Sequence, residues 1–173
     1  MLDTWVTVVP NLKTFCQDYV KSHGADPNQL SLRLKQRLGL PPGAQYDKFI
    51  ELTVDPKDVS SFFRPCADPF PASSTCQPAT ALKPEELKAY LNATGTKGKQ
   101  ELGIRLWFLN NYYASFSSSR QYPWTSLGYT FDWAPKGEGG EFVRFGESEF
   151  VVAKDAPIKF ESVTDTVPYC TSQ

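Results

Sequence analysis

Four cysteines constrain the fold of this chain more than any other feature of its sequence. They are Cys16, Cys66, Cys76 and Cys170, and none of them belongs to a Cys-x-x-Cys pair. A structural zinc site usually takes its ligands in such close pairs, and the chain has a single histidine, His23. We therefore expect no metal site, and the spacing of the cysteines fits two disulfides better.

Four cysteines allow three disulfide pairings. We predict a bond between Cys66 and Cys76, because the proline-containing segment between them is poor in regular structure and gains order from a cross-link. Cys16 then pairs with Cys170, which ties the first predicted helix to a C-terminal tail that would otherwise fray. The alternative is four buried free thiols, which are common in cytosolic proteins.

Composition and charge bear on the partner and on the compartment. The 18 basic and 19 acidic residues nearly cancel, so the chain lacks the broad cationic surface that nucleic-acid binding needs. Charged residues and prolines interrupt every apolar stretch, so we expect no transmembrane segment. Residues 1–5 show no basic segment followed by an apolar one, so we expect no signal peptide within this sequence. With the predicted disulfides, we expect a secreted or periplasmic protein.

Apolar residues at spacings of three and four predict helices in the first two thirds of the chain. Asn28 is the expected N-cap of the second helix, and Pro84 suits the first turn of the third. We predict a helix over residues 102–113, but this run also suits a buried strand. A continuous apolar stretch shows neither the helical nor the strand periodicity. Residues 94–99 are interpreted as a basic turn. The predicted helices cover residues 11–22, 28–39, 84–91 and 102–113.

Strands are expected mainly beyond residue 122, where β-branched and aromatic residues alternate with Gly and Pro turns. Residues 56–84 hold six of the fourteen prolines and should be irregular. The predicted strands cover residues 47–54, 127–133, 141–145, 149–153 and 158–163. Helices first and strands later predict an α+β fold, in which N-terminal helices pack on a C-terminal antiparallel sheet and disulfides stabilise a single domain over residues 1–173.

The most distinctive segment runs from residue 121 to residue 133 and is rich in aromatic rings. Its strand alternates with a period of two, so we expect one of its two sets of side chains to form core. Tyr122 and Trp124 precede this strand, and if exposed they form an amphipathic platform for a partner. The two alternating sets are Tyr129, Phe131 and Trp133 on one face, and Gly128, Thr130 and Asp132 on the other.

A second segment, residues 146–160, contains Glu147 and Glu149 in a Glu-x-Glu turn followed by predicted strands. This stretch resembles the mono-ADP-ribosyltransferase toxins of the Arg, Ser-Thr-Ser, Glu-x-Glu class. The resemblance implies that Glu149 is the catalytic glutamate and that Glu147 orients the acceptor. It also implies that Ser117 begins the counterpart of the Ser-Thr-Ser strand, that Arg64 grips the phosphates, and that NAD is the substrate.

The rest of the sequence favours a function in binding. It contains no glycine-rich phosphate loop, and its lone histidine offers no credible nucleophile partner. Disulfides and abundant aromatic residues suit a durable binding scaffold. We therefore expect an extracytoplasmic binding protein of inhibitor, immunity or recognition type, with a protein or a saccharide as partner and no cofactor. A small NAD-dependent mono-ADP-ribosyltransferase is the alternative.

Overall fold

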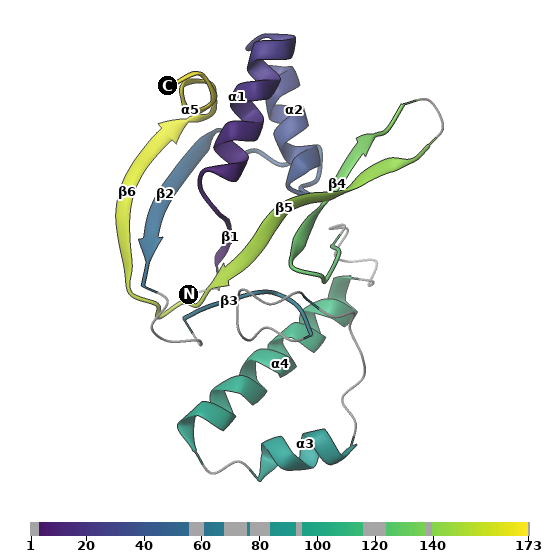
Figure 1. Ribbon diagram of the computed structural model, residues 1–173, viewed down its shortest axis with the longest axis vertical. Coiled ribbons are helices and arrows are strands. Elements are labelled where there is room, and N and C mark those ends of the chain that lie inside the picture. The colour runs from purple at the N-terminus through teal and green to yellow at the C-terminus, as the bar shows by residue number, and fades with distance from the viewer. Residues whose placement is uncertain are drawn as a thin grey trace.

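The structure, a computed structural model, describes residues 4–55, 61–67, 76, 84–92, 95–115, 124–137 and 140–172 (Figure 1). It has the predicted α+β architecture, with antiparallel strand pairs and two disulfides. Its elements, in chain order, are β1 (Thr4–Thr7), α1 (Asn11–His23), α2 (Pro27–Arg37), β2 (Lys48–Val54), β3 (Phe62–Phe63), α3 (Pro84–Leu91), α4 (Thr96–Ser115), β4 (Tyr129–Pro135), β5 (Phe142–Val152), β6 (Ile158–Asp165) and α5 (Thr166–Thr171). The single-domain assignment stays a prediction.

The first two helices form where the apolar spacing predicts them. The start of α2 differs from the prediction, because Asp26 and not Asn28 is the N-cap. The Asp26 carboxylate accepts hydrogen bonds from the backbone N–H groups of Asn28 at 3.1 Å and Gln29 at 2.9 Å. Pro27 is the first helical residue, and its fixed φ suits that position, so the cap lies two residues before the predicted one.

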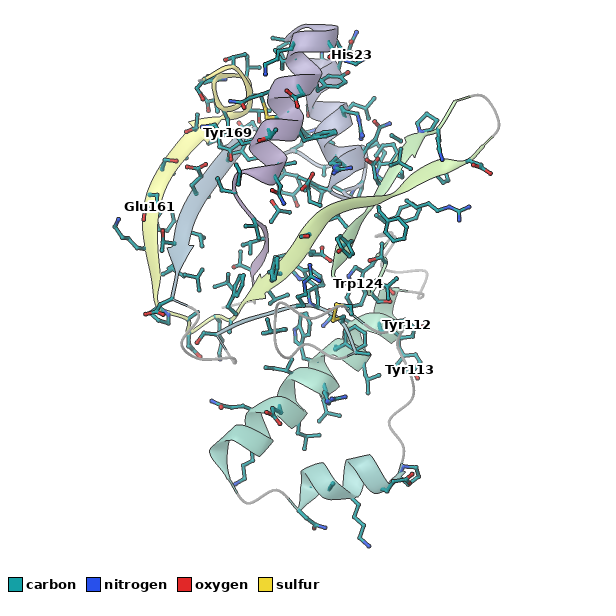
Figure 2. All side chains as sticks on the ribbon, viewed as in Figure 1. His23, Tyr112, Tyr113, Trp124, Glu161 and Tyr169 are labelled. Carbon is teal, nitrogen blue, oxygen red and sulfur yellow. A yellow bond between two sulfur atoms is a disulfide. The ribbon has the colours of Figure 1, made fainter. Side chains whose placement is uncertain are left out.

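The two N-terminal helices and the C-terminal α5 enclose one core, which we call the disulfide core. The Cys16–Cys170 bond lies within it and confirms this predicted pairing. The ring of Tyr169 stacks on Phe49 of β2 with centroids 4.1 Å apart (Figure 2), and its hydroxyl donates to Glu51. The buried members are Leu12, Cys16, Leu30, Leu34, Tyr169 and Cys170.

The central strand of the main sheet is β5, which pairs antiparallel with β1, β3 and β4. The prediction of two strands with a turn at residues 146–148 is wrong, because β5 is continuous from Phe142 to Val152. A glycine is needed at position 146 because neighbouring groups pack closely against its backbone, and not because the chain turns there. A Cβ there would lie 2.1 Å from the Thr130 hydroxyl and 2.2 Å from the Arg37 carbonyl oxygen.

A separate two-stranded ribbon joins β2 to β6 over the length of both strands. One face carries Phe49 and Glu51 toward the disulfide core. The opposite face is apolar and largely exposed, and the pairing register shifts by one residue between Glu51 and Leu52. We call this opposite face the ribbon face, and its exposed members are Ile50, Ile158, Phe160 and Val163.

The helix α4 packs on the other end of the main sheet, opposite α1 and α2 (Figure 1). Ile104 contacts Phe63 and Val151, and Phe108 joins the cluster that contains the Cys66–Cys76 bond. That bond confirms the second predicted pairing. The turn predicted at residues 94–99 is wrong in part, because α4 already begins at Thr96 and continues the helix predicted for 102–113.

Candidate binding surface

The strand β4 turns its polar residues inward and its aromatic residues outward. Thr130, Asp132 and Ala134 are buried, whereas Tyr129, the first ring of the aromatic set, is 36% exposed. Alternation along this strand predicts that one set of side chains is core, and the buried set is the polar one. Trp133 is half-buried, and its indole N–H donates to the Leu40 carbonyl at 3.0 Å.

Two arginines of α2 explain why the polar side of β4 is buried. Arg33 donates two hydrogen bonds to the fully buried carboxylate of Asp132, at 3.1 and 2.9 Å. Arg37 lies 3.6 Å from the same carboxylate and donates from Nε to Glu147 at 2.7 Å. Both guanidinium carbons lie 4.7 Å from the ring centroid of Phe15. Buried charges need such partners, so the paired arginines fix which side of the strand faces inward.

The outward side of β4 and β5 forms a continuous surface that we call the aromatic face. Phe145 and Phe142, its most exposed rings, are 57% and 44% exposed. The guanidinium carbon of Arg64 lies 5.3 Å from the ring centroid of Tyr129 and 5.1 Å from that of Phe150. Arg64 therefore connects these two rings of the surface. Ring contacts join the phenylalanines and Tyr129 in pairs, and strand pairing places Phe131 opposite Phe145. The members of the face are Phe62, Arg64, Tyr129, Phe131, Phe142, Phe145 and Phe150.

The two aromatic residues predicted to bind a partner are placed differently. Tyr122 lies outside the described residues. Trp124 is half-buried between the sheet and α4 (Figure 2), where its ring contacts Phe108 and Trp5 at centroid distances of 5.6 and 5.5 Å. Its indole N–H donates to Glu149 at 3.1 Å. Trp124 therefore connects α4 to the sheet and belongs to the opposite side from the aromatic face.

Glu149 is the most perturbed acidic group among the described residues that titrate. Its side chain is 9% exposed, and burial raises the pKa of this carboxyl to about 7, although the hydrogen bond from Trp124 acts in the other direction. A carboxyl in this environment exchanges protons near neutral pH. Such groups occur at functional sites and also in structural cores, so the pKa does not decide between these roles.

The residues that the toxin resemblance assigns to catalysis are not gathered on one face of the sheet. Arg64 donates to the Ser148 hydroxyl at 3.4 Å and contacts Phe150, so its guanidinium lies on the aromatic face. Glu149 alternates with these two residues along β5 and points to the other face, toward Trp124. Ser117 lies outside the described residues, and Glu147 is held in its ion pair with Arg37.

A hollow of about 450 Å³ borders the aromatic face between α1 and β5. Its lining comes from three parts of the fold: Asn11, Thr14, Phe15 and Asp18 of α1, Arg37 at the end of α2, and Tyr129, Gly146, Glu147 and Ser148 of β4 and β5. Tyr129 thus belongs both to this hollow and to the aromatic face. Local sequence patterns carry no signal for the hollow, because its α1 residues and its sheet residues lie more than a hundred positions apart in the chain.

Comparison of the chain with protein-family models, with curated proteins and with solved structures finds no match. The functional argument therefore rests on the geometry of this molecule. Within the described part of the chain, no three His, Cys, Asp or Glu side chains gather as metal ligands would. Over the same residues, no helix is long and apolar enough to cross a membrane.

Proposed function

We propose that this chain is an extracytoplasmic binding protein, of inhibitor, immunity or recognition type, which contacts its partner through the aromatic face. The observation that carries the proposal is the inverted strand β4, which buries Asp132 and leaves the rings outside. Contiguous apolar patches on a protein surface often mark interaction sites. An aromatic patch that encloses an arginine has the composition of an interaction hot spot.

The energetics favour occupation of this face. Each Å² of apolar surface removed from water contributes about 25 cal/mol, so covering Phe142 and Phe145 favours association. The rings also have little side-chain freedom to lose, because they contact one another and Arg64 before any partner arrives. The face is therefore organised in advance for contact with a planar or apolar group.

The two disulfides support the assignment of the protein to the outside of the cytoplasm. Such bonds persist in oxidising compartments and are rare in the cytosol, and both cysteine pairs are bonded here. They also fit a protein that works as a durable scaffold. The cross-links attach α5 to α1 and brace the segment beside β3, on either side of the main sheet.

The proposal is tested by comparing variants of two exposed apolar surfaces, the aromatic face and the ribbon face. A protein or saccharide captured from a cell-surface extract is purified, and its dissociation constant is measured for each variant. We expect Phe145→Ser together with Tyr129→Ser to weaken binding by at least about tenfold, equivalent to roughly 1.4 kcal/mol. Far- and near-ultraviolet circular dichroism verifies that the variant is folded.

The matched control is Phe160→Ser on the ribbon face, where the ring is 61% exposed against 57% for Phe145. We expect this variant to bind as the unchanged protein does. If the control loses binding while the aromatic-face variant keeps it, the recognition surface has been assigned to the wrong strands.

A further inference from the structure

The hollow between α1 and β5 is the strongest unassigned site in the described residues. It forms where β5 runs past α1, on the strand segment that precedes the pairing of β1 with residues 149–152 (Figure 1). Its volume of about 450 Å³ falls within the range of small-ligand sites and is enough for about one or two sugar rings. The class of ligand that it could bind is therefore inferred from the groups that line it.

Four of the lining residues offer hydrogen-bonding groups that no protein atom in the described part of the chain uses. In the described part of the chain, the Asn11 amide and the hydroxyls of Thr14 and Tyr129 form no hydrogen bond with another protein group. Glu147 is only 4% exposed and uses Oε1 for Arg37, which leaves Oε2 to accept from a ligand. Amides and hydroxyls both donate and accept, which matches a ligand with several hydroxyl groups.

The charges in the hollow are already balanced. Arg37 is offset by Glu147 at 2.7 Å and by Asp132 at 3.6 Å, and Asp18 pairs with Lys21 at 3.2 Å. An anionic ligand would compete with two carboxylates for Arg37, and a cationic ligand would compete with Arg37 for Glu147. The lining therefore favours a neutral ligand over a phosphate, a nucleotide or an amine.

Tyr129 adds an apolar surface to this polar lining. A sugar ring presents hydroxyl groups around its edge and C–H groups on its faces, so it requires polar groups and an aromatic ring in one site. Tyr129 is 36% exposed at the border of the hollow, and its ring contacts Phe145 at a centroid distance of 6.2 Å. A chain of sugars leaving the hollow would meet the aromatic face next.

From these contacts we infer that the hollow binds a neutral saccharide through Asn11, Thr14, Tyr129 and Oε2 of Glu147. This inference rests on the proposed function, because it names a saccharide as the partner that the aromatic face contacts. It adds the hollow as a second region of contact with that partner. The polar hollow selects one sugar by its hydroxyl pattern, and the rings hold the neighbouring part of the same glycan.

The test uses the full chain with both disulfides formed and follows backbone amide resonances by NMR. Neutral tetrasaccharides of glucose, mannose, galactose and N-acetylglucosamine are titrated separately to about 10 mM, above the dissociation constant of a weak site. We expect at least one of them to shift the resonances of Thr14, Gly146 and Ser148. The double variant Asn11→Ala with Thr14→Ala should weaken that binding at least about tenfold, since two hydrogen bonds are lost.

The control variant is Asn28→Ala, which removes an exposed amide from α2 away from the hollow and should leave binding unchanged. If none of the four neutral glycans shifts these resonances, or if only sulfated or uronic glycans do, the inference is overturned. Failure here is distinguishable from failure of the proposed function. If binding of a partner depends on Phe145 but not on Asn11 and Thr14, the aromatic face remains the proposed binding site. That result contradicts only the inference that the hollow binds a saccharide.

Discussion

The disulfide core and the β4–β5 unit bury opposite kinds of side chain. In the disulfide core, Leu12, Leu30 and Leu34 point inward around the Cys16–Cys170 bond, and charged residues lie outside. In the β4–β5 unit, Asp132 and Glu147 point inward and the phenylalanines lie outside. The two regions share α2, whose leucines face the first and whose arginines face the second.

This difference shows that one helix can satisfy two environments. Leu30 and Leu34 are four residues apart, as are Arg33 and Arg37, so each pair forms one stripe on the surface of α2. The apolar stripe supplies burial, whereas the arginine stripe determines which side of β4 is covered. A buried ion pair contributes little net stability compared with apolar packing, and here the pairs of Asp132 and Glu147 leave the aromatic side chains on the outer side of the two strands.

The largest expected effect comes from removing the cross-link of the disulfide core. The double variant Cys16→Ala with Cys170→Ala opens a loop with a sequence separation of 154 residues, and the chain-entropy model assigns such a bond about 5 kcal/mol. Urea unfolding without reductant measures the loss. The corresponding variant of Cys66 and Cys76, with a separation of 10, should lose less, about 3 kcal/mol. Equal losses would contradict the loop-length argument.

The next effect addresses the charged side of β4. Asp132→Ala should destabilise the protein by roughly 4 kcal/mol, because Arg33 then stays partly buried without its carboxylate. Unfolding in urea at pH 7 provides the measurement. Asp18→Ala, which breaks an exposed ion pair with Lys21, is the matched control and should have little effect. A mild loss for Asp132→Ala would mean that the ion pairs do not orient β4.

A third effect depends on pH. The pKa of Glu149 is raised to about 7 in the folded protein, so its favourable contribution is fully present below the unfolded pKa near 4.5 and is lost as pH rises through 7. This group should make the protein about 3 kcal/mol more stable at pH 4 than at pH 8. Glu149→Gln should remove that difference from the urea midpoints. If the variant keeps the same dependence of stability on pH, groups other than Glu149 are responsible for it.

A smaller effect separates the two regions by exposure. Phe145→Ser should change the free energy of unfolding by no more than about 0.5 kcal/mol, since the ring is mainly in water. Leu34→Ala in the disulfide core should cost roughly 3 kcal/mol, because it leaves a cavity. Thermal unfolding of both variants gives the comparison. A large loss for Phe145→Ser would identify the aromatic face as core rather than as a binding surface.

The smallest expected effect concerns the transferase alternative. Because Arg64 and Glu149 point to opposite faces of the sheet, we expect no release of nicotinamide when the oxidised protein is incubated with NAD. Chromatography of the products detects turnover. Release that disappears in Glu149→Gln would reverse this expectation and make the buried side of β5 a catalytic site.

Much of the fold follows from local patterns in the sequence. The spacing of the apolar residues gave α1 and α2, and the distribution of the cysteines gave both disulfides. The short helix α5 was missed, because Pro168 and the brevity of the segment hide its period. The continuity of β5 was missed because Gly146 is typical of a turn, and only the approach of Thr130 and Arg37 explains it.

The candidate site was predicted less well than the fold. The alternation in β4 was visible in the sequence, but Tyr129 and Asp132 were equally available for burial until Arg33 was placed beside the strand. A signal existed in the spacing of Arg33 and Arg37, which puts two cations on one side of a helix that also carries buried leucines. This spacing indicates a buried acidic partner but does not identify Asp132 as that partner.

By itself, the sequence determined the helices, the strand propensities and the cross-links, because each depends on neighbouring residues or on a few reactive side chains. Tertiary structure alone decided which face of β4 lies inside, since the ion pair that fixes it joins residues 99 positions apart. It also decided that Arg64 and Glu149 diverge and that Asn11 meets Glu147 across a hollow. These relations depend on how separate elements pack, which no local pattern encodes.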